Sequence, residues 1–276
     1  MAAARPHRTV WVSGSAGKLG GEVCRQLRAA GHRVLEADVA GPDPVDLLDP
    51  AAVAASLRGA DAIIHCAAIP SPEQIDPAEL VKINTLTCFN ALEQAWLAGI
   101  RTAVVASSGS IYGTAWSPEP LPYEAVPVDE DTPLRYVDPY ALTKDFTERT
   151  AAMYARRGMI TTALRFHWIL SAEESAGLAG SGDDAAGGSN LWGYVDLGDA
   201  ARACLLALDP RPEHSGCEVL VIAAAETLSA TPTEQLLDRY LPEAERLRPI
   251  PGTAGGFDTT RAERTLGWRP EHRLRR

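Results

Sequence analysis

The sequence carries little positive charge. Its 26 Lys and Arg residues are outnumbered by 36 Asp and Glu residues, which gives a formal net charge of -10. Non-specific nucleic-acid binding needs a basic footprint that neutralises phosphates, so no nucleic-acid partner is expected. The chain also lacks an apolar run of membrane-spanning length, and Gly14 and Gly17 interrupt its first apolar stretch. We therefore expect neither a membrane segment nor a signal peptide.

Cysteine is scarce as well. The 276 residues include five cysteines, and no two of them fall in a C-x-x-C spacing. An odd, scattered set is typical of reduced thiols, which predicts a cytoplasmic protein that folds without disulfides. No metal site is expected, because one acidic group in the second half has no His or Cys partners at metal-ligand spacing. That group consists of Glu173, Glu174, Asp183 and Asp184.

Apolar runs alternate with segments of helical period, which is typical of βαβ units around a parallel sheet. The pattern predicts strands at 9–13, 33–37, 62–66, 102–106, 161–166 and 218–222. It predicts helices at 19–30, 78–97, 140–157, 196–208, 233–241 and 257–268. Residues 116–139 are rich in proline and acid and are expected to form a surface excursion, and the Gly- and Ser-rich residues 171–190 a loop.

These elements predict an α/β fold, a Rossmann-like doubly wound parallel sheet with a small C-terminal α/β lobe. The main domain is expected over residues 1–168. Residues 169–276 are expected to form mainly a substrate lobe, with some segments that return to the main domain.

The segment GSAGKLG, from Gly14 to Gly20, has the spacing G-x-x-G-x-x-G between a predicted strand and a predicted helix. Glycine permits the tight turn and the close approach of backbone to a pyrophosphate, and the helix N-terminus offers unpaired N–H groups. Three spaced glycines alone are equally typical of an ordinary loop, so the strand and helix around them carry the argument. The segment predicts a dinucleotide site.

Asp38 follows the second predicted strand, 24 residues after Gly14. A carboxylate there can accept hydrogen bonds from the adenosine ribose hydroxyls and repel a 2′-phosphate, which favours NAD over NADP. An aspartate at the end of a strand is also a common turn residue. Lys18 is the one feature of the loop that points toward NADP.

Tyr140 and Lys144 form a Y-x-x-x-K motif at the start of a predicted helix, so both side chains lie on one face. Free tyrosine, with a pKa of about 10, is a poor base at neutral pH, but a lysine ammonium one turn away favours the phenolate. Ser108 follows a predicted strand and is placed to bond a substrate oxygen. An isolated Y-x-x-x-K motif is usually part of an ordinary surface helix. Here the motif follows the glycine loop, Asp38 and Ser108 in that order, and this combination predicts hydride transfer at a secondary alcohol or ketone.

At this point the chain resembles the extended short-chain dehydrogenase/reductase family, also called the NAD-dependent epimerase/dehydratase group. The resemblance covers nearly the whole chain. It is carried by the glycine loop, Asp46-Leu47, IIHCAAI from Ile63, Asn84, SSGSIYG from Ser107, YALTK from Tyr140, YVDLGDAARA from Tyr194 and FDTTRAERTLGWRP from Phe257.

The resemblance implies roles for these residues. Tyr140 is the acid/base, Lys144 binds the nicotinamide ribose, Ser108 orients the substrate and Asn84 supports the lysine side. The helices that carry Asn84 and Tyr140 often form the dimer interface in relatives, so a homodimer is expected. With the glycine loop and Asp38, the implied NAD contacts are Gly14, Ala16, Gly17, Lys18, Leu19, Gly20, Asp38, Asp46, Leu47, Cys66, Ala67, Ala68, Tyr140 and Lys144.

The chain departs from relatives that act on nucleotide sugars. Those usually carry a pattern like R-Y-F-N after the sixth strand, whereas here Arg165 is followed by Phe166, His167 and Trp168. They also carry a longer segment before the Y-V-D motif than Ile169 to Gly193. The candidate substrate residues are Ser108, Ser110, His167, Trp168 and Arg165.

Two interpretations stand for these candidates. His167 and Trp168 either line a small-substrate pocket or pack in the interior, and Arg165 either contacts a carboxylate or phosphate or is a structural partner. Three aromatic residues likewise either border the substrate mouth or anchor the proline-rich loop: Tyr112, Trp116 and Tyr123.

The sequence therefore predicts an NAD-dependent oxidoreductase that transfers a hydride on a small sugar or sugar acid. The first alternative is a nucleotide-sugar epimerase or dehydratase, in which the hydride returns to the substrate. The second is a non-catalytic NAD(H)-binding sensor, although such a module has no need of the acid/base pair.

Overall fold

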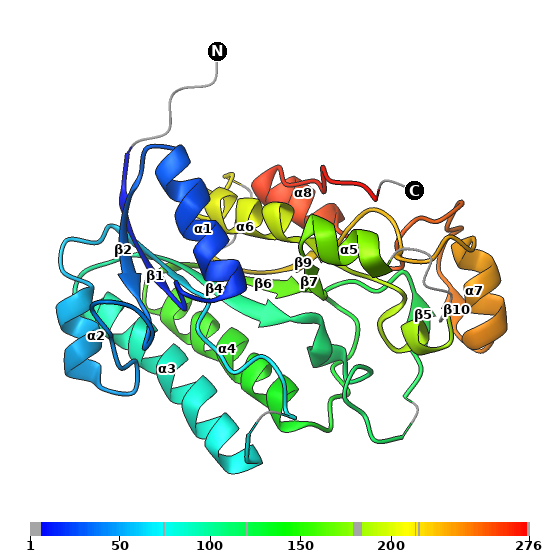
Figure 1. Cartoon of the computed structure of the whole chain (residues 1–276), viewed down its shortest axis with the longest axis horizontal. Coiled ribbons are helices and arrows are strands. Elements are labelled where there is room, and N and C mark those ends of the chain that lie inside the picture. Colours follow the sequence, from blue (N-terminus) through cyan, green and yellow to red (C-terminus); the bar gives the residue numbers. More distant parts are fainter. Residues whose placement is uncertain are drawn as a thin grey trace.

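A six-stranded parallel sheet forms the centre of the protein (Figure 1). The computed structural model describes residues 7–73, 75–119, 121–178, 184–212, 214 and 216–274. The strand order is β2-β1-β3-β4-β6-β9. The strands are β1 (Thr9–Ser13), β2 (Arg33–Ala37), β3 (Ala62–His65), β4 (Thr102–Ser108), β6 (Ile160–Phe166) and β9 (Cys217–Ile222). The predicted Rossmann-like fold is confirmed, and β4 is longer than predicted, so that Ser108 is its last residue.

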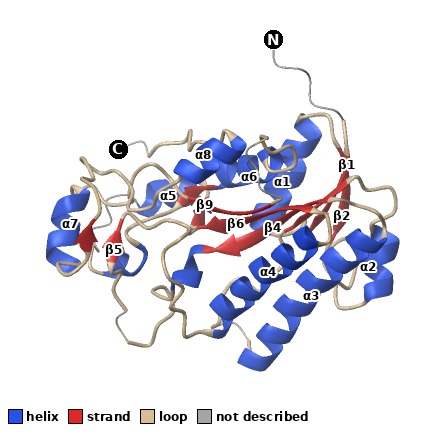
Figure 2. Cartoon of the chain, turned by 180° about the vertical axis from the view of Figure 1, so that it is seen from behind, coloured by secondary structure: helices blue, strands red, loops and turns tan. Residues whose placement is uncertain are grey.

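Helices cover both faces of the sheet (Figure 2). On one face lie α1 (Lys18–Ala29), α6 (Leu197–Leu206) and α8 (Thr260–Leu266), and on the other α2 (Pro50–Ser56), α3 (Pro77–Leu97) and α4 (Pro139–Arg156). Val10 and Val12 of β1 pack toward the first group, and Trp11 toward the second. Successive side chains of a strand point to opposite faces, which explains why the strands are continuous apolar runs.

The order of the strands creates a crevice at the carboxyl end of β1. Its neighbours β2 and β3 lie on opposite sides of it, so the chain connections run in opposite directions from this point. Open α/β sheets bind their ligands at such a switch point. The glycine loop after β1 and the segment after β3 meet there.

A small lobe has its own apolar core at one end of the sheet. It contains α7 (Thr233–Tyr240), the two-stranded pair β5 (Ala125–Val126) and β10 (Glu245–Arg246), and the short helix η2 (Ala186–Asn190). Tyr123, Val126 and Val128 are buried in this core. The prediction that residues 116–139 are only a surface excursion is therefore wrong, because their aromatic and branched side chains pack against distant parts of the chain.

The predicted loop at 171–190 also contains regular structure. It includes α5 (Ala172–Leu178) and η2, and it follows β7 (Ile169–Leu170), which pairs with β8 (Val195–Asp196). Residues 179–183, and with them Asp183, lie outside the described residues. Beyond residue 168, β9 joins the main sheet and α6 packs on α1. The boundary at 168/169 stays a prediction.

Among the described helices, none combines the length and apolar character needed to cross a membrane. All five cysteines fall in the described part, where none of them is in a disulfide.

A buried ion pair fastens α4 to the sheet. Arg165 of β6 makes two parallel bonds of 2.8 Å to the carboxylate of Glu148, and their side chains are 5% and 8% exposed. Ser107 donates to the same carboxylate at 2.6 Å, and Arg165 also donates to the Tyr112 hydroxyl at 3.1 Å. Such a bidentate pair uses the fixed fork of the guanidinium. These contacts favour the interpretation of Arg165 as a structural partner over its contact with a substrate.

Breaking this pair is expected to be costly. Glu148→Leu leaves the Arg165 charge buried without a partner, which should lower the free energy of unfolding by about 3–5 kcal/mol. The double variant Glu148→Leu, Arg165→Met should recover a large part of that loss. Urea denaturation measures both, with Lys82→Ala as the control, since its half-exposed pair with Glu79 should contribute less than about 1 kcal/mol. Equal losses in the Glu148 and Lys82 variants would contradict the assignment.

Candidate active site

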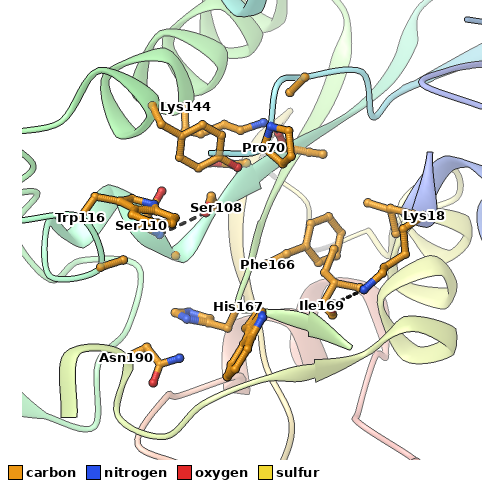
Figure 3. Close-up of a pocket in the computed structure, with 18 of the residues that line it drawn as sticks. Lys18, Pro70, Ser108, Ser110, Trp116, Lys144, Phe166, His167, Ile169 and Asn190 are labelled. Carbon is orange, nitrogen blue, oxygen red and sulfur yellow. Dashed lines mark hydrogen bonds between the residues drawn. The ribbon is translucent and has the colours of Figure 1, made fainter. Parts of the chain in front are cut away.

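A cavity of about 880 Å³ opens at the carboxyl ends of β1, β3, β4 and β6. It brings together the glycine loop and the Tyr140–Lys144 motif, which lie more than 120 residues apart in the sequence. Figure 3 shows Lys18 and Ile169 on one side of it and Ser110, Trp116 and Asn190 on the other. Of the predicted site residues, the lining includes Gly14, Gly17, Lys18, Leu19, Gly20, Cys66, Ala68, Ser108, Ser110, Tyr140, Lys144, His167 and Trp168.

The glycine loop has no room for a side chain at Gly14 or Gly20. Gly14 has a φ of +69°, and a Cβ on it would lie 2.7 Å from the Ala67 nitrogen. A Cβ on Gly20 would lie 2.1 Å from the Gly14 carbonyl oxygen. Helix α1 begins directly after Gly17, an N-cap with no side chain to bond the first N–H groups. The loop therefore fits a pyrophosphate, whose oxygens would approach the bare backbone and the positive end of the helix.

Lys18 joins the glycine loop to the segment beyond β6. Its ammonium is 2.7 Å from the Glu174 carboxylate of α5 and donates to the Ile169 carbonyl at 3.3 Å. Both charged side chains are nearly half exposed. The predicted contact of Lys18 with a cofactor stays a prediction.

The residues predicted for the adenosine side follow β2. Asp38 accepts hydrogen bonds from the Ala16 and Ala40 N–H groups, both at 3.0 Å, one on each oxygen. A carboxylate has further lone pairs for ribose hydroxyls. Leu47 is buried, and its carbonyl accepts a bond of 2.9 Å from Asn90 of α3. With exposed Asp46, these residues lie outside the cavity lining as far as the described chain shows.

Tyr140 and Lys144 lie in the first turns of α4 and are both buried. Asp138 caps the helix by accepting from the Ala141 N–H at 2.8 Å. The Lys144 ammonium donates to the Ala106 carbonyl at 2.9 Å and lies 5.5 Å from the centre of the Tyr140 ring. The positive charge is thus held beside the Tyr140 ring. Ser108 also opens on the cavity, and its hydroxyl accepts from the Ser110 N–H at 3.1 Å.

Asn84, on helix α3, links two segments beside Tyr140 and Lys144. Its side chain exchanges two hydrogen bonds with the Ile69 backbone, at 2.8 and 3.1 Å, and donates to the Thr143 hydroxyl at 3.2 Å. It therefore ties the segment after β3 to α4 directly before Lys144. These contacts are compatible with the predicted role in support of the lysine.

The wall of the cavity that lies away from the glycine loop contains described polar atoms without hydrogen-bond partners. Within the described chain, the Ser110 hydroxyl and His167 Nε2 are buried and make no hydrogen bond. Burial, and next the charge of Arg165, lower the pKa of His167 to about 3. Its ring lies 3.6 Å from that of Phe257 and stacks on Tyr112 at 6.2 Å. Trp168, the other aromatic residue in question, lines the cavity and is half exposed.

Sequence reasoning missed part of this wall. Thr114, Ser189 and Asn190 line the cavity, and none of them belongs to a motif. Trp116 and Tyr123 also line it, whereas Tyr112 bonds the Asp129 carbonyl at 2.8 Å and anchors the loop. An asparagine in a Gly-rich stretch gives no periodic signal, so only the fold could place Asn190.

One cluster of potential metal ligands was not anticipated. Ligand atoms of Asp196, Asp199 and His272 all lie within 4.8 Å of one another. The carboxylates already accept backbone bonds: Asp196 from Gly198 at 2.7 Å, and Asp199 from Glu271 and His272 at 2.9 Å. The contacts explain the cluster as the attachment of the C-terminal segment to α6.

Comparisons with known proteins agree with this geometry. The model of a family described as "NAD dependent epimerase/dehydratase family" matches residues 10–177. The chain is 27% identical to a UDP-glucose 4-epimerase of Lactobacillus helveticus, over 95% of this chain and 92% of that one. It is 28% identical to an L-arabinose 1-dehydrogenase (NAD(P)(+)) of Haloferax volcanii, over 87% and 93%.

A solved structure is similar over the whole fold. It is a short-chain dehydrogenase/reductase superfamily protein from Agrobacterium tumefaciens with bound NAD. The identity is 25%, the TM-score is 0.71, and the match covers 96% of this chain and 93% of that one.

We expect NAD to bind more tightly than NADP, because Asp38 would face the 2′-phosphate and is followed by Val39 and Ala40 rather than an arginine. Asp38→Asn should narrow the difference by removing the repulsion while an amide oxygen still accepts from Ala16. Calorimetric titration with both cofactors measures this, and Asp43→Asn, an exposed carboxylate on the same loop, serves as a matched control. Tighter binding of NADP to the unaltered protein would refute the expectation.

Proposed function

Because this chain belongs to the NAD-dependent epimerase/dehydratase family and is an NAD-dependent enzyme, we propose that it oxidises or reduces a small sugar or sugar acid. The observation that carries the proposal is the single cavity shared by Ser108, Tyr140, Lys144 and the glycine loop. A hydride donor or acceptor held on that loop and an alcohol held at Tyr140 would meet inside it.

The chemistry asked of the protein is proton transfer. NAD, when bound, would supply the acceptor for the hydride of the alcohol carbon. Tyr140 takes the hydroxyl proton as the C–H and O–H bonds break and the carbonyl forms, and reduction runs the same steps backward. Lys144 keeps two N–H donors beyond its bond to Ala106, with which it can hold the nicotinamide ribose beside Tyr140. Ser108 is placed to donate to the substrate oxygen.

The size of the cavity favours a small substrate. Its volume of about 880 Å³ must take the nicotinamide and pyrophosphate portions of the cofactor as well as the substrate. Pockets for a single drug-sized ligand span roughly 300–1,000 Å³. A small sugar beside those portions of the cofactor suits a volume of this order.

Cations for a diphosphate are committed elsewhere. Residues 167–195 contain no Lys or Arg. Beyond them, Arg202 bonds Asp199 at 2.9 Å and Arg261 bonds Asp131 at 2.6 Å. A diphosphate normally needs arginine forks or helix N-termini to hold it. Of the two activities named for the relatives above, the L-arabinose 1-dehydrogenase is therefore nearer to the proposal than the UDP-glucose 4-epimerase.

Tyr140→Phe should keep the fold and NAD binding and lose roughly 10²–10⁴-fold in kcat, because only the acid/base oxygen is removed. Tyr136→Phe is the matched control: it removes a phenolic oxygen that bonds Asp145 of α4 and does not line the cavity. Rates of NADH formation on a substrate found by screening sugars and sugar acids measure both. A Tyr140 variant as active as the control would exclude the assigned role.

Nucleotide sugars should not bind with useful affinity. UDP-, dTDP- and GDP-sugars are titrated into the NAD-loaded protein by calorimetry, with the matching free sugars alongside. We expect heat only from some of the free sugars. Micromolar affinity for a nucleotide sugar, lost when the nucleotide is removed, would overturn the proposal in favour of an epimerase.

We also propose a homodimer through α3 and α4, in a protein of the cytoplasm. The two helices pack side by side and carry the exposed apolar residues Leu86, Phe89, Leu142 and Phe146. The spacings 86/89 and 142/146 each place a pair on one helix face. Exposed apolar patches of this kind mark protein interfaces.

Sedimentation velocity tests the dimer. The unaltered protein is expected to sediment with twice the monomer mass, and the double variant Leu86→Glu, Phe89→Glu as a monomer, because two charges would be buried in the contact. Leu97→Glu, on the same helix but beyond this patch, is the control and should leave the dimer intact. A monomeric unaltered protein would dismiss the proposal.

A further inference from the structure

The end of the cavity away from the glycine loop is almost free of charge. Among the described residues that line the cavity, the charged side chains are Lys18 and Lys144. Lys144 is held beside Tyr140. Lys18, at the right of the view in Figure 3, is paired with Glu174. The guanidinium of Arg165 sits behind the wall, where Glu148 neutralises it. The polar side chains that remain at this end are uncharged.

Two of these side chains have an unused hydrogen-bonding atom. His167 Nε2 and the Ser110 hydroxyl are buried and lack partners within the described chain. Since burial holds the imidazole neutral at pH 7, its two nitrogens are one donor and one acceptor. Buried polar atoms are normally satisfied, and an unpaired one is destabilising until a ligand bonds it. A hydroxyl group, which both donates and accepts, can satisfy either atom.

An anion is poorly matched to the same wall. A carboxylate that leaves water needs charged or multiple donors to offset its desolvation. The Ser110 N–H at the start of η1 (Gly109–Tyr112) is already bonded to Ser108, so this donor is not available to an anion. His167 cannot supply a positive charge at neutral pH, because Arg165 and burial both disfavour its protonation.

We propose that the substrate is an uncharged carbohydrate, an aldose or polyol, whose hydroxyls are bonded by His167 and Ser110, and that sugar acids are excluded. This rests on the proposed function and narrows it from sugars and sugar acids to the neutral class. His167 and Ser110 then determine specificity by contact with the substrate, while Tyr140 performs the proton transfer.

Matched sugar pairs test the charge. Galactose with galacturonate, and glucose with glucuronate, differ by a CH₂OH group in place of a carboxylate. Initial rates with saturating NAD, and calorimetric binding to the NADH-loaded protein in which no turnover occurs, are measured together with arabinose and xylose. We expect kcat/KM for a neutral sugar to exceed that of any acid by about tenfold or more, a difference of about 1.4 kcal/mol. An acid that matches or exceeds the neutral sugars overturns the inference and leaves the proposed function intact.

If no free sugar or acid binds or reacts while a nucleotide sugar does, the proposed function itself is wrong, and the inference with it. The calorimetric arm separates these outcomes, because it detects binding to protein that is not turning over.

Variants of the wall test the assigned contacts. His167→Phe keeps an aromatic ring between Tyr112 and Phe257 but removes Nε2, so KM for the neutral sugar should rise about tenfold with little change in kcat. His167→Gln, which retains a polar end, should recover part of the loss, and Ser110→Ala should raise KM independently. NAD affinity and Tm serve as controls for folding. Unchanged KM in both His167→Phe and Ser110→Ala would overturn the contacts.

A final variant adds the missing charge. Trp168 lines the cavity with 52% of its surface exposed, so an arginine can replace it without burying an ion. Trp168→Arg should raise kcat/KM for the acid relative to its neutral partner, and Trp168→Gln, which removes the ring without adding charge, should not. An arginine variant with an unchanged ratio would show that charge is not what excludes the acids.

Discussion

The buried ion pair between Arg165 and Glu148 determines how the parts of the active site meet. Glu148 lies one helical turn beyond Lys144 on α4, and Ser107, which also bonds it, directly precedes Ser108. The carboxylate of Glu130 accepts from the Val221 N–H of β9 at 2.8 Å, and its carbonyl accepts from Arg165 at 3.1 Å. Buried charges tolerate only well-formed geometry, so the catalytic helix, the serine strand and the lobe are held in one arrangement.

The same pair also determines which side-chain groups of the cavity are free to bind a ligand. Arg165 stands immediately before Phe166 and His167, next to the substrate wall. By binding Glu148 it becomes structural, and it helps to keep His167 neutral. The ion pair thus uses the guanidinium that lies nearest in sequence to this wall, and the groups that remain on the wall can bond hydroxyls. The stability of the fold and the proposed selectivity of the site therefore depend on one side chain.

The parts that the sequence could predict are those fixed by short-range physics. β1, the tight turn at Gly14, and the start of α1 are consecutive, so apolar runs and glycine spacing are sufficient to identify them. Tyr140 and Lys144 share a helix face for the same reason, and Asp38 follows β2 directly. Helix α2 was missed because seven residues that are mostly alanine give little periodicity.

The substrate wall could be predicted only in part. Ser110, His167 and Trp168 were candidates, whereas Thr114, Ser189 and Asn190 come from segments that carry no pattern. Thr114, Asn190 and the ring of His167 meet only after the lobe has folded around Trp192 and Phe257. The role of Arg165 did leave a signal. Glu148 repeats the spacing from Tyr140 to Lys144 once more along α4, which places an acid on the helix face that looks toward the sheet.

The contact between Lys18 and Glu174 has a consequence for the catalytic cycle. It joins the glycine loop to α5 beside the cavity, which Lys18 lines. An enzyme of net oxidation must release its dinucleotide after each turnover, whereas an epimerase can retain it throughout. An ion pair exposed to this degree contributes roughly 0–1 kcal/mol to stability and is screened by salt, so thermal motion breaks it readily. A contact this weak suits the proposed dehydrogenase, in which the cofactor would come and go as a second substrate.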